Sequence, residues 1–495
     1  MTMHSFLRVR TALATLPLAL IVAGCTVGPN FARPEASATG GYAPVTSNRA
    51  ALGEAAPRTW WQAFGSAELD SLVDRALANN ASLEASRATL QRARERVNAV
   101  AGKRLPQVDA SGKVQHQQFN LSAIGLGDRF ASAGIPAMGN PEFDLYTLGA
   151  GVSYDLDLFG GNRRALEQAG AEARAQTRQA EAAHLLIAGR VVLQAMAIAA
   201  LNDRIATERA LIAEAERNLS LTDQRRRAGV GTMVEVLSAE GQLASDRAAL
   251  PALEQALTEA RGILAVLLGV SPAELGATDY SLDQFSLPEQ VPVTLPSQLV
   301  RGRPDIVEAE ERLHAATAAI GMAEARLYPD ITLGATISQS STDPGNLTKS
   351  GFRGFDIFAG LAAPIFHGGT LRAEKRGAEA GARAAAASYR QVVLDAFAQV
   401  SGLLSALDTD GRALAAQQQA AQVAERSLHL SRRSFEVGNS GILQVLDASR
   451  ANQRARIALV QARAQQYANV ARLLAATAGG WTGSLDRETG SGGAD

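Results

Sequence analysis

The chain has 495 residues, enough for roughly two to four ordinary domains. Its 48 Lys and Arg residues nearly balance its 49 Asp and Glu residues, so no nucleic acid or other polyanion is expected as a partner. Aromatic residues make up only 5%, which argues against a large all-β protein.

The N-terminus has the pattern of a bacterial secretory signal. Arg8 and Arg10 precede an apolar run, Thr11 to Val22, that is shorter than the roughly 20 residues a membrane-spanning helix needs. Val22-Ala23-Gly24-Cys25 then resembles the lipobox, in which the cysteine is acylated and becomes the new N-terminus. Cys25 is the only cysteine, so a lipid anchor is expected there, and the alternative is an ordinary signal with an accidental cysteine. No other stretch of the sequence is expected to be apolar enough to span a bilayer as a helix.

Helical patterns rich in Ala, Leu, Gln, Glu and Arg fill most of the remaining chain. We expect helices at about 68–103, 162–227 and 233–268, and again at about 305–327, 371–436 and 442–476. At 1.5 Å per residue, each of the two longest helices would reach roughly 100 Å. Such helices cannot bury an Ala/Leu stripe alone, so they need neighbouring helices.

Four strands are expected between these helices because apolar and polar residues alternate there. The patterns lie near 106–116, 147–158, 329–339 and 354–365, and the fourth is the least regular. Period-two patterning over about ten residues is typical of transmembrane β-strands. A sheet in a membrane must close, and known barrels need at least about eight strands. Four strands per chain therefore predict that several copies assemble.

The two halves of the chain repeat each other. Leu83 and Pro106 match Ile306 and Pro329 at one offset (306 − 83 = 329 − 106 = 223). Gly229 and Leu264 match Gly438 and Leu473 at another (438 − 229 = 473 − 264 = 209). We divide the chain into a signal peptide (1–24), a lipid-anchored extended segment (25–67), a first repeat (68–286), a connector (287–302), a second repeat (303–480) and a flexible tail (481–495).

Motifs spread from end to end resemble the TolC/OprM group of outer-membrane efflux proteins, specifically the NodT-type lipoproteins. They are Cys25-Thr26-Val27-Gly28-Pro29-Asn30-Phe31, Trp60-Trp61 with Phe64, Leu295-Pro296-Ser297, Arg303-Pro304-Asp305-Ile306, Pro364-Ile365-Phe366 with Gly368-Gly369, and Gly479-Gly480-Trp481. The resemblance implies an α+β membrane protein of the Gram-negative outer membrane. Three copies would form a 12-stranded β-barrel, with four strands per protomer, continued by a long α-helical barrel in the periplasm.

The resemblance also implies function and partners. The expected trimer is the passive outer-membrane channel of a tripartite efflux pump for drugs or other small toxic compounds. It would dock a periplasmic adaptor (membrane fusion) protein and an inner-membrane transporter of the RND class. Cys25 would carry an N-palmitoyl group and an S-diacylglycerol group and would be held in outer-membrane lipid. No other cofactor, metal or catalytic residue is expected.

The helix turns at 227–232 and 436–441 are expected to form the periplasmic tips. Gly229, Gly231, Gly438 and Gly441 would supply the positive φ angles that such turns often need. Leu443, Asp447 and Arg450 follow at spacings of four and three, so they share one helix face.

In OprM-like relatives the residues that match Leu443, Asp447 and Arg450 line a closed aperture. The resemblance therefore implies a constriction at Leu443, a carboxylate ring at Asp447 and its partner at Arg450, with Glu235 as a further tip residue. The residues alone leave an alternative open, in which Asp447 complements a helix N-terminus and pairs with Arg450 on a solvated face.

Two other classes of protein would explain part of the sequence or none of it. A structural coiled-coil lipoprotein without a channel would explain the helices and the anchor but not the four alternating strands. A periplasmic enzyme would need a catalytic or metal-binding cluster. The six histidines are scattered, and no phosphate-binding loop or nucleophile elbow occurs in the sequence.

Overall fold

The structure, a computed structural model, describes residues 26–35, 42, 49–120, 140–276 and 278–478. Cys25, the signal peptide and the tail after residue 480 lie outside these described residues. The chain divides into two compact units. Unit 1 comprises 1–32, 92–173 and 312–386, and unit 2 comprises 33–91, 174–311 and 387–495.

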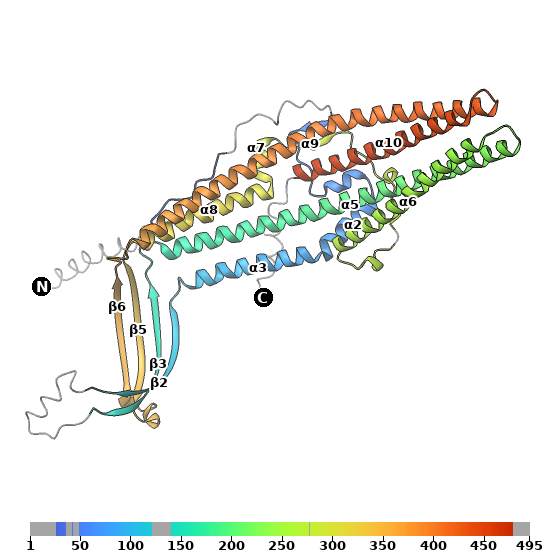
Figure 1. Cartoon of the computed structure of the whole chain (residues 1–495). Coiled ribbons are helices and arrows are strands. Elements are labelled where there is room, and N and C mark those ends of the chain that lie inside the picture. The colour runs from blue at the N-terminus through green and yellow to red at the C-terminus, as the bar shows by residue number, and fades with distance from the viewer. Residues whose placement is uncertain (1–25, 36–41, 43–48, 121–139, 277, 479–495) are drawn as a thin grey trace, which may run out of the picture. The chain divides into compact units, whose positions relative to one another are not determined.

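Unit 1 is built on one antiparallel sheet (Figure 1). Its strands are β2 (Gln107–Gln118), β3 (Glu142–Asp155), β5 (Asp330–Ser341) and β6 (Arg353–Ala362), in the order β2-β3-β5-β6. Strand β3 begins five residues before the predicted start at 147 because it pairs along the full length of β2, from Gln118↔Glu142 to Gln107↔Ser153. Among the described residues, the edge strands β2 and β6 each have one side without a partner strand.

The helices begin and end close to the sequence patterns. They are α2 (Ala67–Asn79), α3 (Ala81–Gly102), α5 (Gly161–Arg227), α6 (Met233–Leu267), α7 (Pro296–Gly302), α8 (Pro304–Ala325), α9 (Thr370–Glu436) and α10 (Ile442–Thr477). Short 3₁₀ helices are η1 (Trp60–Phe64), η3 (Pro272–Glu274), η4 (Leu282–Gln284), η5 (Pro344–Asn346) and η6 (Ser350–Phe352). Helices α5 and α9 have 67 residues each, which corresponds to roughly 100 Å.

The single helix predicted for 68–103 is wrong, because Asn80 divides it into α2 and α3. The Asn80 carboxamide oxygen accepts hydrogen bonds from the backbone N–H groups of Ser82 (3.0 Å) and Leu83 (3.3 Å), and so caps α3. Its nitrogen donates to the carbonyl of Leu267 at 2.8 Å. Asparagine is a favoured capping residue, and the helical periodicity on both sides concealed the break.

The predicted connector at 287–302 also contains regular structure. Strand β4 (Val291–Val293) pairs in parallel with β1 (Ala50–Leu52), and α7 follows with Pro296 in its first turn. This pairing joins segments about half the chain apart, which local sequence patterns cannot indicate. The small sheet belongs to unit 2.

Both long helices also contain a window that is long and apolar enough to cross a membrane by composition. The expectation that no such stretch follows the signal is therefore wrong by this measure. Half of the α5 window is buried inside the fold, and the core helices of soluble proteins pass the same test. Composition alone does not place α5 or α9 in a membrane.

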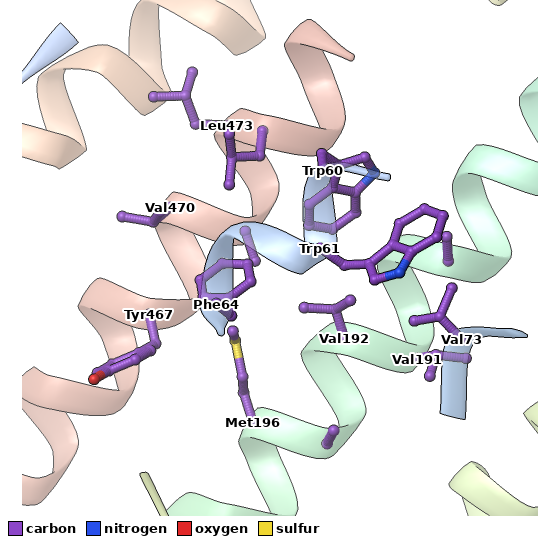
Figure 2. Close-up of a cluster of buried hydrophobic side chains, with 14 of the residues drawn as sticks. Trp60, Trp61, Phe64, Val73, Val191, Val192, Met196, Tyr467, Val470 and Leu473 are labelled. Carbon is purple, nitrogen blue, oxygen red and sulfur yellow. The ribbon is translucent and has the colours of Figure 1, made fainter. Parts of the chain in front are cut away.

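The main hydrophobic core of unit 2 forms around η1. Trp60, Trp61 and Phe64 are buried against one another, with the ring of Trp60 edge-on to Trp61 (6.0 Å between centroids) and to Phe64 (6.5 Å). Figure 2 shows these rings between α5 and α10, which contribute Val191, Val192, Met196, Tyr467, Val470 and Leu473. The aromatic motif ahead of the first helix therefore holds helices from both repeats together.

Candidate functional site

The turn after α5 and the turn after α9 have the same backbone geometry. Gly229 donates to the carbonyl of Arg226 (3.0 Å), and Val230 donates to that of Arg225 (3.0 Å). Gly438 donates to Phe435 (3.1 Å), and Asn439 donates to Ser434 (2.9 Å). With φ of 77° at Gly229 and 81° at Gly438, both are Schellman endings, in which a glycine just past the helix adopts the left-handed conformation.

The predicted positive φ is correct for Gly229 and Gly438 but wrong for Gly231 and Gly441. Gly441 has φ −81° and ψ 160° and is the N-cap of α10, where nothing lies within 4 Å of an added Cβ. At Gly231 an added Cβ would lie 3.0 Å from the backbone nitrogen of Arg226, so close approach of the chain explains that glycine. In each turn the first glycine adopts the left-handed conformation, and the second lies just before the next helix.

Leu443, Asp447 and Arg450 share an exposed face of the first turns of α10, as their spacing predicts. Arg450 Nη1 lies 3.3 Å from Asp447 Oδ1, and the Asp447 side chain is 77% exposed. Arg450 Nε also donates to Gln242 Oε1 on α6 at 2.6 Å. In the single chain this is a solvated ion pair, as the open alternative expected, but Arg450 is additionally tied to the other repeat.

Next to this ion pair, further along α6 and α10, a polar network joins α6, α10 and α5 within unit 2. Gln242 Nε2 donates to Asp246 Oδ1 (2.7 Å), and Gln453 Nε2 donates to the same oxygen (3.0 Å). Gln453 Nε2 also lies 3.5 Å from Glu208 Oε1. Asp246 and Glu208 are both buried, so two carboxyl groups share this interior site.

The pKa of Glu208 is raised, first by its burial and then by the negative charge of Asp246. Arg204 and the hydrogen bond from Gln453 act in the opposite direction but do not cancel these effects. Burial and the neighbouring carboxylate therefore both disfavour the charged form of Glu208.

The spacing of residues in α6 carries a sequence signal for this network. Buried positions of α6 follow a three-and-four spacing through Val236, Ala239 and Leu243, and continue at Leu253 and Leu257. Asp246 occupies a position on this stripe, where an apolar residue is expected. A charged residue on a coiled-coil seam marks a buried polar contact.

Glu235 has a local structural contact. Its carboxylate accepts a hydrogen bond from the backbone N–H of Thr232 (2.8 Å), and Thr232 Oγ1 accepts one from the N–H of Glu235 (3.3 Å). This reciprocal pair is a capping box that begins α6. Its role as a tip-lining residue stays a prediction.

The hairpin ends are joined by a cation–π contact as well as by apolar packing. The Arg225 guanidinium lies 4.4 Å from the Phe435 ring centroid. Phe435 also belongs to a small hydrophobic core, made of Ala239, Leu428, Phe435, Ile442, Val445, Leu446 and Ala448. The tips of the two repeats are therefore packed together in the single chain.

The sheet of unit 1 has one apolar and one polar face. Strand pairing places Val108 beside Val152, Ala150 beside Ile337, and Ile337 beside Phe355. The next residues along the strands form the other face, with Ser111 beside Gly149, Gly149 beside Ser338, and Thr336 beside Asp356. Val108, Leu148, Ile337, Phe355, Ile357 and Leu361 are exposed on the apolar face. A sheet that exposes apolar side chains on one face and polar ones on the other fits a barrel between lipid and water.

No group of three or more His, Cys, Asp or Glu side chains in the described part of the chain is placed to hold a metal ion.

Comparison with known proteins gives one consistent family. Residues 72–270 and 295–479 match the family described as outer membrane efflux protein. The chain is 32% identical to the pyoverdine export outer membrane protein OpmQ of Pseudomonas aeruginosa, covering 86% of this chain and 88% of OpmQ. It is 30% identical to nodulation protein T of Rhizobium leguminosarum bv. viciae, covering 97% and 94% of the two chains.

Two further similarities concern membrane attachment and fold. The probable outer membrane lipoprotein SilC of Salmonella typhimurium is 27% identical, over 95% of this chain and 98% of SilC. The solved structure of the outer-membrane channel OprN superposes with a TM-score of 0.84 at 28% identity, and covers 92% of this chain and 100% of that one.

Proposed function

Because the chain belongs to the outer membrane efflux protein family, and so is an outer-membrane channel of an efflux pump and not an enzyme, we propose that it acts as a homotrimer that exports drugs or other small toxic compounds passively. The observation that carries this proposal is the two-faced sheet of unit 1. An export channel requires a polar interior and an apolar exterior, and the strand register separates the two.

The sheet also supports assembly from several copies. Its four strands are too few to close a barrel, and the edge strands β2 and β6 have backbone groups that need partners in a membrane. Pairing β6 of one copy with β2 of the next would satisfy both edges. Three copies would give about twelve strands, a number within the range of known barrels.

The tips supply a surface for a periplasmic adaptor and, through it, an inner-membrane RND transporter. Apolar side chains outside the proposed aperture are exposed at both turns: Val230, Met233, Val234 and Leu237 in the first repeat, and Val437 in the second. Several exposed apolar side chains close together in sequence at a helix turn favour contact with another protein. Energy would be supplied at the inner membrane, so the channel needs no reaction centre.

The anchor proposal rests on sequence and on one relative. Cys25 ends a lipobox-like tetrapeptide, and SilC carries the word lipoprotein in its name. We assign an N-palmitoyl and an S-diacylglycerol group to Cys25, which lies outside the described residues.

Leu443, Asp447 and Arg450 are proposed to close the periplasmic end of the channel. In a three-fold assembly their exposed face of α10 would become three stacked rings. The hydrogen bond from Arg450 to Gln242 would hold α10 against α6 and keep the rings narrow. Opening would then require this link to break.

The double variant Asp447→Ala/Arg450→Ala is therefore expected to raise single-channel conductance severalfold in planar bilayers. The variant removes both the charged rings and the link to α6. Arg456→Ala, a change at an exposed arginine further along α10, serves as the control and should leave conductance unchanged. Unaltered conductance and cation selectivity in the double variant would reject the aperture role.

The proposed function as a whole is tested by the mass and conductance of the purified lipoprotein. Detergent-extracted protein should have the mass of three chains, and it should conduct ions when added to a planar bilayer. A folded protein that stays strictly monomeric, or a trimer without conductance, would contradict it.

A further inference from the structure

The N-terminal segment Thr26–Phe31 is docked in unit 1 by a buried arginine. Arg164 on α5 has a side chain that is only 4% exposed. Its Nε donates to the carbonyl of Val27 (3.1 Å), and its Nη2 donates to the carbonyl of Gly28 (3.1 Å) and to Asn30 Oδ1 (2.9 Å). Three of its contacts therefore go to a segment more than 130 positions away in sequence.

The opposite side of Arg164 is held by an acid and a histidine. Arg164 Nη1 lies 2.7 Å from Glu167 Oε2, and Glu167 Oε1 lies 2.9 Å from His314 Nε2 on α8. The His314 ring stacks on Phe31, with centroids 4.3 Å apart and planes within 10°. Burial raises the pKa of Glu167, but the hydrogen bonds and electrostatic interactions with Arg164 and His314 lower it more, so the net shift is downward.

Close backbone contacts seat the same segment. Gly28 has φ of 87°, and an added Cβ would lie 2.5 Å from the Cα of Gly321 on α8. An added Cβ on Gly160 would lie 2.9 Å from the Cα of Thr26. Only glycines fit at these two contacts, so the segment and its receiving surface match in shape as well as in charge.

The docking position coincides with the ends of the strands. Val27 donates its N–H to the carbonyl of Phe159 at 3.1 Å, four residues after β3 ends at Asp155. The ring of Phe159 stacks on Tyr328, which directly precedes Pro329 and β5. Aromatic side chains at strand ends are typical of the boundary between membrane and water.

We propose that Arg164, Glu167 and His314 form a positioning site for the acylated N-terminus, which we name the N-terminal clasp. It binds Thr26–Phe31 of its own chain and fixes the point where the lipid leaves the protein at the level of the strand ends. The acyl chains would then enter the periplasmic leaflet beside the barrel. This role rests on the proposed acylation of Cys25, the residue before Thr26.

The clasp is tested by photo-cross-linking in the full-length protein made with its own signal. Phe31 is replaced by p-benzoylphenylalanine, whose cross-link to α8 peptides containing His314 reports docking. Arg164→Ala removes three hydrogen bonds to the segment, and Gly28→Ala, made independently, adds a Cβ that would clash with the Cα of Gly321. Each variant should lower the cross-link yield by about tenfold or more. Arg164→Lys, which keeps the charge but not the fork of donors, should give an intermediate yield.

Matched measurements separate docking from folding and from acylation. Arg372→Ala, at an exposed arginine of α9, should keep the wild-type cross-link. Far-UV circular dichroism of every variant should retain the helical signal, and incorporation of labelled palmitate should be unchanged because the lipobox is intact. Wild-type cross-linking in both Arg164→Ala and Gly28→Ala would overturn the clasp. Absence of palmitate in the wild type would overturn its anchoring role, while bilayer conductance would still test the channel separately.

Discussion

Replacing Trp60 by alanine is expected to lower the free energy of unfolding by about 3–5 kcal/mol, the usual cost of truncating a buried large aromatic residue. Trp60 is fully buried and contacts Trp61 and Phe64 within η1, and the surrounding side chains come from α5 and α10 (Figure 2). Its loss would leave a cavity where helices of the two repeats meet. Denaturant unfolding in detergent, followed by far-UV circular dichroism, measures the change.

Two companion variants make the Trp60 result specific. Trp60→Phe should cost much less, because it keeps most of the ring and removes an indole N–H that is buried without a hydrogen-bond partner among the described residues. Leu52→Ala, at an exposed position of β1, should change stability little. A loss for Trp60→Ala no greater than that for Leu52→Ala would show that η1 does not hold the helices together.

The long helices and their ends could be predicted because local chemistry determines them. The expected ranges 162–227 and 371–436 differ from α5 and α9 by one residue at the start. Gly229 and Gly438 end these helices with the same pattern of two backbone hydrogen bonds. The two glycines occupy matching positions in the sequence repeat, which indicated both helix ends. The family match confirms the predicted fold class, with long helices and four strands in two repeats, together with the outer-membrane channel function.

Features that depend on distant residues could not be predicted in the same way. The pairing of β1 with β4 and the capping of α3 by Asn80, whose side chain also bonds Leu267, join remote parts of the chain. Arg164 is one of many arginines on charged helices, and only its burial against Val27 and Gly28 distinguishes it. The motif that contains Gly28 and Phe31 could be recognised in the sequence, but its contacts with Arg164 could not.

Ile357→Lys is expected to block stable insertion of the barrel, whereas the neighbouring Asp356→Lys should not. Ile357 lies in the middle of β6 on the apolar face and is 77% exposed, and Asp356 points to the polar face. A lysine facing lipid near the bilayer midplane costs about 2–4 kcal/mol in each copy, and an assembly carries that cost once for every chain. A lysine on the polar face remains in water.

The two variants place the same side chain one residue apart. Asp356→Lys changes the net charge by two units and Ile357→Lys by one, so net charge alone would give the larger effect to Asp356→Lys. Membrane fractionation should find Asp356→Lys in the outer membrane at the wild-type level and Ile357→Lys strongly depleted. In planar bilayers Asp356→Lys should conduct with weakened cation selectivity, because a positive side chain then lines the water-filled interior. Equal insertion of both proteins would mean that the apolar face of the sheet is not covered by lipid, and the channel would have to be sought elsewhere in the fold. The register that pairs Ile357 with Ala335 and Asp356 with Thr336 makes the opposite outcome the expected one.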